Sequence, residues 1–150
     1  MKKIGIVVAM QEEHEAIKAI MTDIEVKQIW DLRFLVGKVQ GKQCVLVQSG
    51  IGKVNAARTT QVMIDNFDIN YVVNLGAAGS VNSMLKIGDI VIGEHVVQHD
   101  FDTTAFGHSK VYITGIGNYV ECDRQLVDEF ENVIKGMPEM NYNIKLGVVA

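Results

Sequence analysis

The chain has 150 residues and a formal net charge of −4, and 48% of its residues are hydrophobic. This length is enough for one domain with a substantial core, and the apolar content excludes an intrinsically disordered chain. The acidic balance lacks the basic footprint of a nucleic-acid-binding protein, and no apolar run approaches the roughly 20 residues of a membrane-spanning helix.

The N-terminal segment is typical of a buried strand. Residues 4–10 are apolar, but acidic residues follow at once and the small-residue cleavage site of a signal peptide is absent. We therefore predict a strand over residues 3–9 of a cytoplasmic protein, followed by a helix over residues 11–21. Cys44 and Cys122 show no CxxC spacing, which predicts reduced thiols.

The rest of the chain alternates between strand-like and helix-like patterns. Short apolar runs predict strands over residues 25–39 (broken near Asp31 and Leu32), 44–48, 71–75, 90–97 and 144–150. Helical spacing predicts helices over residues 53–66 and 124–135, the second of them capped by Asp123. The first of these helices carries a stripe of Ala56, Thr60, Met63, Ile64 and Phe67. Strands alternating with helices predict one compact α/β domain with a largely parallel or mixed sheet.

Three of the predicted strands end in segments suited to a ligand. These segments cover residues 9–13, 49–53 and 74–79. In open α/β sheets, ligands bind beyond the carboxyl ends of the strands. Two of the segments are rich in glycine, so their backbone can approach a ligand closely. We therefore expect the functional site at this edge of the sheet.

A cluster of acidic residues follows the first predicted strand. Helical periodicity places Glu13 on an apolar stripe, together with Ala16, Ile17 and Ile20. Glu12 and Glu15 fall on the polar face, where the helix N-terminus favours each negative charge by about 0.3–1 kcal/mol. That preference does not account for a carboxylate on the apolar face, because an unpaired buried charge is costly. Glu13 is thus either a functional carboxylate or a further charge at the helix terminus.

Motifs for phosphate, metal and nucleophile chemistry are not favoured. The segment Gly50-Ile51-Gly52-Lys53 fails as a phosphate loop, because valines stand where a glycine and a Ser or Thr are required. Asn55 occupies the place of a glycine in a dinucleotide-binding fingerprint. His95 and His99 are four residues apart on a strand-like stretch and lack a third ligand with convincing spacing. A GxSxG nucleophile motif is absent.

Four longer segments occur in order along nearly the whole chain: KKIGIVVAMQEE, VQSGIGKVNAA, VVNLGAAGSVNSMLKIGDIVI and HDFDTTAFG. Together they resemble the 5′-methylthioadenosine/S-adenosylhomocysteine nucleosidases of the purine nucleoside phosphorylase-like family. The resemblance implies a three-layer α/β/α sandwich with a mixed central sheet. It also implies hydrolysis of the bond between adenine and a 5′-thioribose in methionine salvage, by a homodimer without metal or cofactor.

The resemblance assigns roles to residues near the first two strand ends. Glu13 falls on the family's water-activating glutamate, the same residue that periodicity places on the apolar stripe. Positions that line the ribose and the attacking water fall on Ala9, Met10 and Ile51. These residues are therefore the expected catalytic and substrate-binding groups of the first part of the chain.

Further substrate contacts are implied later in the sequence. The loop beside the base and the sugar falls on Ala77, Ala78 and Gly79. Ala77 replaces a serine that is common in the family, so any hydroxyl contact at this position is lost. Thr103 and Phe106 fall on a segment that covers the 5′-thio group of the neighbouring subunit, although an apolar loop residue such as Phe106 is also typical of a packing anchor.

Two elements of the family are missing from the sequence. One is a Met-Glu pair that binds the ribose hydroxyls, and the other is a Ser-Asp pair whose aspartate protonates adenine. The chain also ends on the apolar segment KLGVVA, which as a strand needs cover on both faces. We therefore expect residues 1–150 to be the N-terminal part of an incomplete single nucleosidase domain. Because the leaving base must be protonated as well as water activated, we expect this chain alone to have little or no activity.

Two alternatives to a hydrolase stay open. A purine nucleoside phosphorylase must bind a phosphate dianion, usually through arginines. The three strand ends instead carry Lys53 as their one cation and Glu13 as an anion, and Asn74 stands where phosphorylase relatives have an arginine. Hydrolysis is therefore favoured. A non-catalytic nucleoside-binding module is the second alternative, and the position of Glu13 argues against it for the parent protein.

Overall fold

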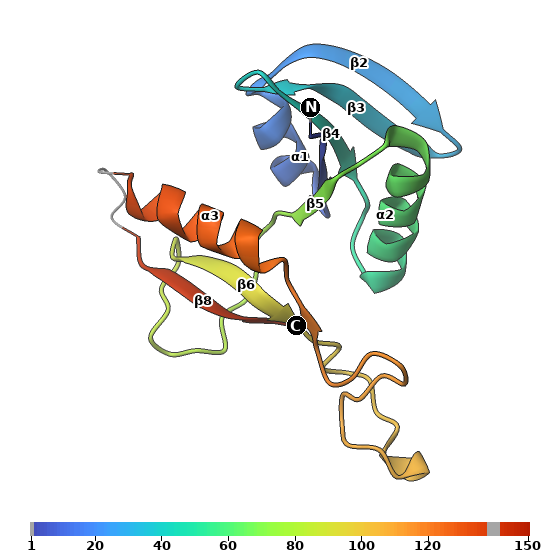
Figure 1. Ribbon diagram of the computed structural model, residues 1–150, viewed down its shortest axis with the longest axis vertical. Coiled ribbons are helices and arrows are strands. Elements are labelled where there is room, and N and C mark those ends of the chain that lie inside the picture. Colours follow the sequence, from blue (N-terminus) through green and yellow to red (C-terminus); the bar gives the residue numbers. More distant parts are fainter. Residues whose placement is uncertain (1, 138–141) are drawn as a thin grey trace. The chain divides into compact units, whose positions relative to one another are not determined.

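The computed structural model describes residues 2–137 and 142–150 of the chain (Figure 1). The chain forms two compact units, Met1–Gly79 and Ser80–Ala150. No helix in the described part of the chain has both the length and the apolar character needed to cross a membrane.

The first unit consists of one sheet and two helices. Its strands are β1 (Ile4–Val8), β2 (Met21–Ile29), β3 (Leu32–Val39), β4 (Lys42–Gln48) and β5 (Tyr71–Asn74), in the spatial order β2-β3-β4-β1-β5. Its helices are α1 (Gln11–Lys18) and α2 (Lys53–Phe67). β1 pairs in parallel with β4 and β5, whereas β2, β3 and β4 pair antiparallel in sequence order. The sheet is therefore mixed, as predicted.

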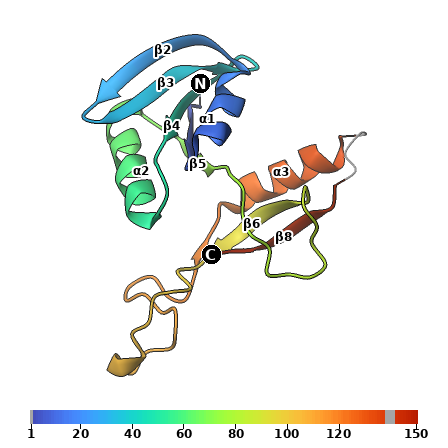
Figure 2. The ribbon, with the colours of Figure 1, turned by 180° about the vertical axis from the view of Figure 1, so that it is seen from behind.

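The two helices lie on opposite sides of this sheet (Figures 1 and 2). Successive side chains of a strand point to opposite faces. On β1, Val7 accordingly belongs to a buried cluster with Met63 of α2, whereas Val8 belongs to a second cluster against which Ile17 of α1 packs. These three layers confirm the predicted α/β/α sandwich.

The helix after β1 is shorter than predicted. α1 ends at Lys18 rather than near residue 21. Met21 already pairs with Val39 in the antiparallel ladder between β2 and β3. The ladder supplies backbone hydrogen bonds that one more helical turn would otherwise have provided.

The apolar stripe predicted for this helix is only partly correct. Ile17 packs against the buried cluster beneath α1, but Ile20 is 58% exposed and Ala16 is also exposed. Glu12 and Glu15 lie in solvent, as predicted. Because residue 20 lies beyond the end of the helix, helical spacing does not determine where its side chain points.

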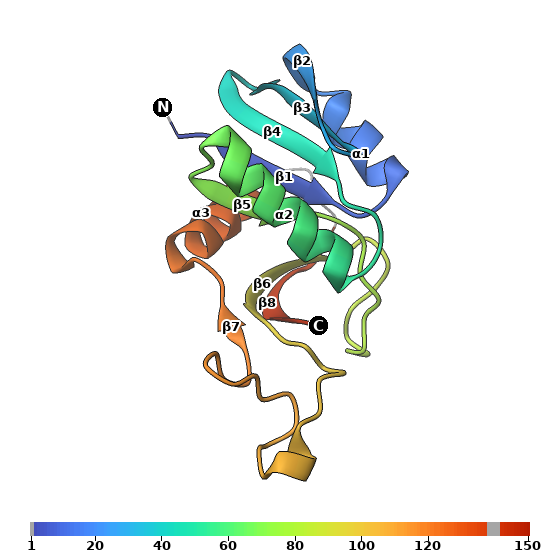
Figure 3. The same cartoon turned by 90° about the vertical axis from the view of Figure 1, so that its right-hand side faces the viewer.

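The second unit combines three strands with a helix. β6 (Ile90–Val96) pairs in parallel with β8 (Ile144–Val149) and antiparallel with the short β7 (Val120–Glu121), in the order β7-β6-β8 (Figure 3). The helix is α3 (Arg124–Lys135), and a short 3-10 turn, η1, covers Thr104–Phe106. The predictions of β6, α3 and β8 are confirmed. β7 and η1 come from a stretch without a periodic signal and escape prediction.

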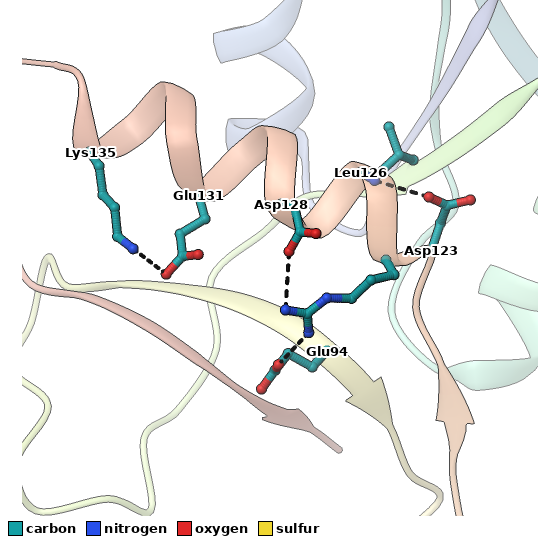
Figure 4. Close-up of polar contacts among 7 residues, drawn as sticks. Glu94, Asp123, Leu126, Asp128, Glu131 and Lys135 are labelled. Atoms are coloured by element: carbon teal, nitrogen blue, oxygen red, sulfur yellow. Dashed lines mark hydrogen bonds and ion pairs between the residues drawn. The ribbon is translucent and has the colours of Figure 1, made fainter.

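The predicted cap of α3 is also confirmed. The Asp123 carboxylate accepts a hydrogen bond from the backbone N–H of Leu126 at 2.9 Å (Figure 4). Arg124 forms ion pairs with Glu94 of β6 and Asp128 of α3, each at 3.1 Å. Exposed ion pairs contribute about 0–1 kcal/mol, whereas a capping side chain contributes about 1 kcal/mol. The cap is therefore the stronger determinant of where α3 begins.

Candidate active site

The carboxylate of Glu13 is held by three backbone N–H groups. Those of Ala9 and Met10 donate to Oε2 at 2.9 and 3.0 Å, respectively. The N–H of Ala77 donates to Oε1 at 2.9 Å. The side chain is half-buried, so it lies between the sheet edge and solvent. The structure therefore brings three of the predicted site residues onto the predicted catalytic glutamate.

Two features of the chain produce this arrangement. Met10 is extended and precedes α1, which places Glu13 at the third position of the helix, where a glutamate can reach back to the N-cap. β5 pairs in parallel with β1, and the N–H of Leu75 donates to the carbonyl of Val7 at 3.2 Å. The chain that leaves β5 therefore passes directly beside the start of α1.

Helix capping alone does not explain the site. The bonds from Ala9 and Met10 are local and are what a capping glutamate makes. Ala77, however, is 64 residues away in sequence and belongs to the segment after a different strand. Glu13 therefore joins two strand ends, which is a tertiary role beyond that of a helix-terminal charge.

The three donors set the ionisation state of Glu13. The N–H of Ala77, followed by those of Met10 and Ala9, lowers the pKa of the Glu13 carboxyl below the ordinary value of 4.5, while partial burial opposes this shift. A carboxylate has about four acceptor positions on its two oxygens. The hydrogen bonds above use two on Oε2 and one on Oε1. A position on Oε1 thus remains for a further donor, such as a water molecule.

Ser49 links the first strand end to the second, a role that the sequence reasoning missed. Its N–H donates to the carbonyl of Val8 at 2.8 Å, and its hydroxyl lies 3.2 Å from the same carbonyl and 2.8 Å from that of Gly50. The side chain is half-buried. The position of this hydroxyl residue between a buried strand and a glycine turn is the sequence signal that could have marked Ser49 as part of the site.

The turn after Ser49 presents Ile51 to solvent. Ile51 is 77% exposed, and its carbonyl accepts a hydrogen bond from the side-chain amide of Asn55 at 2.8 Å. Gly50 and Gly52 have φ angles of 81° and 104°, a region that favours glycine. Ile51 makes no hydrogen bond to Glu13, so its predicted contact with the ribose stays a prediction.

The other predicted residues are placed but do not contact Glu13 through hydrogen bonds. Ala78 and Gly79 are exposed and follow Ala77 at the end of the first unit. Thr103 and Phe106 belong to the second unit. The Thr103 hydroxyl donates to the carbonyl of Tyr112 at 3.3 Å, and Phe106 is 82% exposed. Over residues 2–137 and 142–150, no group of three or more His, Cys, Asp and Glu side chains gathers in a way that could hold a metal ion.

We expect Glu13 to make the stability of the protein depend on pH. Its pKa is lower in the folded state than in the unfolded state. The stabilisation is therefore present above pH 4.5 and is lost as the pH falls through the folded pKa. The unfolding midpoints of the wild type and of Glu13→Gln should therefore differ above pH 4.5 and converge as the pH falls below it. Glu12→Gln, on the exposed side of α1, is the matched control, and a midpoint difference independent of pH would contradict the prediction.

Comparisons with known proteins relate this geometry to a family. Residues 3–150 match the model of the phosphorylase superfamily. A 5′-methylthioadenosine/S-adenosylhomocysteine nucleosidase of Marinomonas sp. strain MWYL1 is 38% identical over 146 residues, which cover 97% of this chain and 63% of the relative. A nucleosidase of the same name from Staphylococcus haemolyticus is 39% identical with the same coverage.

Solved structures agree with the sequence matches. The nucleosidase of the same name from Colwellia psychrerythraea, in complex with adenine, has a TM-score of 0.93 and is 36% identical. That comparison covers 98% of this chain and 60% of the other. The chain spans about 63% of the length of the curated relatives that it matches.

Proposed function

This chain belongs to the phosphorylase superfamily, and from that premise we propose that the protein carrying it is a nucleosidase of 5′-methylthioadenosine and S-adenosylhomocysteine. It would hydrolyse the bond between adenine and the ribose, releasing adenine and the 5′-thioribose product. The observation that carries this proposal is the Glu13 carboxylate, held by three backbone N–H groups at two adjacent strand ends. Relatives that bear this activity in their names support it.

Glu13 would act on the attacking water. Oε1 accepts a hydrogen bond from the water and orients its oxygen toward C1′ of the ribose. As the water oxygen bonds to C1′, the bond from C1′ to the adenine nitrogen breaks, and the water loses a proton to the carboxylate. A carboxylate of low pKa accepts that proton only as the water becomes acidic in the transition state. The leaving adenine also gains a proton, from an acid that we assign to none of the described residues.

The charge of the site supports water over phosphate as the nucleophile. Phosphate is a dianion, and the ionised Glu13 would repel it at the point of attack. An arginine fork is the usual means of binding phosphate. Ala9, Met10 and Ala77, which surround the carboxylate, contribute backbone N–H groups that Glu13 itself occupies. Hydrolysis therefore agrees better with this geometry than phosphorolysis.

Several finer assignments belong to the same proposal. The two units would be parts of one nucleosidase domain, which residues 1–150 do not complete. The protein would work in the cytoplasm in methionine salvage, as a homodimer. In that dimer Thr103 and the exposed Phe106 would cover the 5′-thio group bound by the neighbouring subunit, which gives the exposure of Phe106 a reason.

Adenine release without phosphate is the expected result for the protein expressed from its complete coding sequence. Chromatography of adenine formed from 5′-methylthioadenosine, with and without added phosphate, measures it. The rate should be unchanged by phosphate because water is the nucleophile. Adenine release that requires phosphate would contradict hydrolysis, and binding without any turnover would favour a nucleoside-binding module. The chain of residues 1–150, assayed alongside, should show little or no turnover.

A further inference from the structure

Gly76 lies unusually close to the Glu13 carboxylate. A Cβ atom added at this glycine would lie 2.6 Å from Oε1, 3.1 Å from Cδ and 3.3 Å from Oε2. Real Cβ atoms essentially never lie within 3.0 Å of an atom to which they are not bonded, and ordinary van der Waals contacts lie at 3.4–4 Å. Any other residue at position 76 would therefore force the carboxylate to move.

Backbone conformation does not require this glycine. Gly50 and Gly52 adopt positive φ angles of 81° and 104°, where side chains are strained. Gly76 is not among the glycines with positive φ. An alanine could thus adopt the same backbone conformation, and the contact with Glu13 is the remaining reason for a glycine at this point.

We infer that Gly76 is a positioning residue of the nucleosidase site, whose missing side chain lets the peptide before Ala77 pass against Glu13 and fix the direction of its carboxylate. The inference rests on the proposed function for its kinetic consequence. The claim that Gly76 sets the direction of the Glu13 carboxylate does not depend on that function, because it concerns only the contact between position 76 and Glu13.

A side chain at position 76 would disturb the Glu13 carboxylate rather than the fold of the chain. A new Cβ at position 76 would meet the end of a flexible side chain, which can rotate away at little cost to the fold. Rotation would, however, break the hydrogen bond from the N–H of Ala77 to Oε1. The carboxylate would also turn away from the water that Oε1 is to orient. Gly76→Ala should therefore stay folded, lose only the stability that this one hydrogen bond contributes, and lose activity.

The backbone groups that contact the Glu13 carboxylate belong to residues without titratable side chains, so a change in its pKa reports on its hydrogen bonds. The segments that meet it contribute backbone groups of Ala9, Met10 and Ala77, none of which has a titratable side chain. On α1, Glu12 is exposed, and the His14 ring lies 3.5 Å from the carboxylate of its other neighbour, Glu15. Loss of the Ala77 hydrogen bond, the largest cause of the low pKa, should raise the pKa of Glu13 toward 4.5.

Kinetics and NMR of the protein from its complete coding sequence test the inference. Misplacing a catalytic group by about 1 Å can cost about 100-fold in rate, so Gly76→Ala should lower kcat by about that factor with little change in KM. Its melting temperature should fall by no more than that of Glu13→Gln, because both variants lose the hydrogen bond from Ala77 and keep the rest of the fold. Carbon-detected NMR of the Glu13 carboxyl should show the raised pKa. Gly147→Ala is the matched control, since a Cβ there would meet only Val91 at an ordinary 3.8 Å.

A double-mutant cycle decides whether Gly76 acts through Glu13. In the Glu13→Gln background, Gly76→Ala should cause no further loss of kcat, because coupled residues are not additive. Additive losses, or a Gly76→Ala protein with wild-type kcat and an unshifted Glu13 pKa, would overturn the inference. If the wild type releases no adenine, the proposed function fails, and the NMR titration alone then decides whether Gly76 positions the carboxylate.

Discussion

Replacing Glu13 by glutamine lowers the rate of adenine release by about 10²–10⁴-fold, the contribution typical of a general base. Glutamine is close in shape but cannot take the proton that the attacking water loses. Its amide oxygen can still accept from Ala9 and Met10. Its NH₂ group then faces the N–H of Ala77, where two donors oppose each other. Initial rates with 5′-methylthioadenosine, measured on the protein from its complete coding sequence, give the factor.

Glu12→Gln separates the role of this carboxylate from that of charge near the helix N-terminus. Glu12 is the exposed neighbour on the same turn of α1, and its replacement removes the same unit charge. Its rate of adenine release should stay close to that of the wild type. Calorimetry with a non-hydrolysable 5′-thioadenosine analogue should show that Glu13→Gln still binds. Equal losses in the two variants would mean that Glu13 acts only as a helix-terminal charge.

Replacing Phe34 by alanine lowers the free energy of unfolding by about 3–5 kcal/mol, the range found for aromatic side chains removed from cores. Phe34 is fully buried in β3, and its ring centroid lies 4.8 Å from that of Phe67 at the end of α2. The contact thus joins the antiparallel part of the sheet to the helix that packs on it. Alanine would leave a cavity that the surrounding strands and helix fill only in part. Urea unfolding followed by circular dichroism measures the loss.

Trp30→Ala is the control for the Phe34 prediction. Trp30 lies between β2 and β3 and is 74% exposed, so truncating it removes little buried surface. Its replacement should change the free energy of unfolding by less than about 0.5 kcal/mol. A similar loss in both variants would show that the first unit does not depend on the cluster around Phe34.

The face of α2 shows how far periodicity reaches. Met63 and Phe67 are buried as predicted, but Ile64 is 45% exposed. Thr59 and Val62, which the predicted stripe left out, are buried instead. The stripe is displaced because the side of a helix that faces the core depends on where the sheet lies. A buried threonine among apolar residues also weakens the hydrophobic pattern by which sequence reasoning finds that side.

Some features of the candidate site could likewise be predicted from the sequence, and others could not. The sequence alone determined that an acidic residue stands where the first strand gives way to a helix, and that its side chain differs from its exposed neighbours. Capping by Asp123 and the alternation of strands and helices were likewise readable. All of these features depend on residues within a few positions of one another, where spacing and side-chain chemistry act directly.

The third donor to the Glu13 carboxylate, unlike the two local ones, comes from tertiary structure. The N–H of Ala77 reaches it from 64 residues away, and Gly76 leaves the space that this approach needs. Both depend on the parallel pairing of β1 with β5, which no local pattern encodes. Strand pairing sets the distances between residues that are remote in sequence. The contact between Ala77 and Glu13 depends on such a pairing, so local sequence patterns could not predict it.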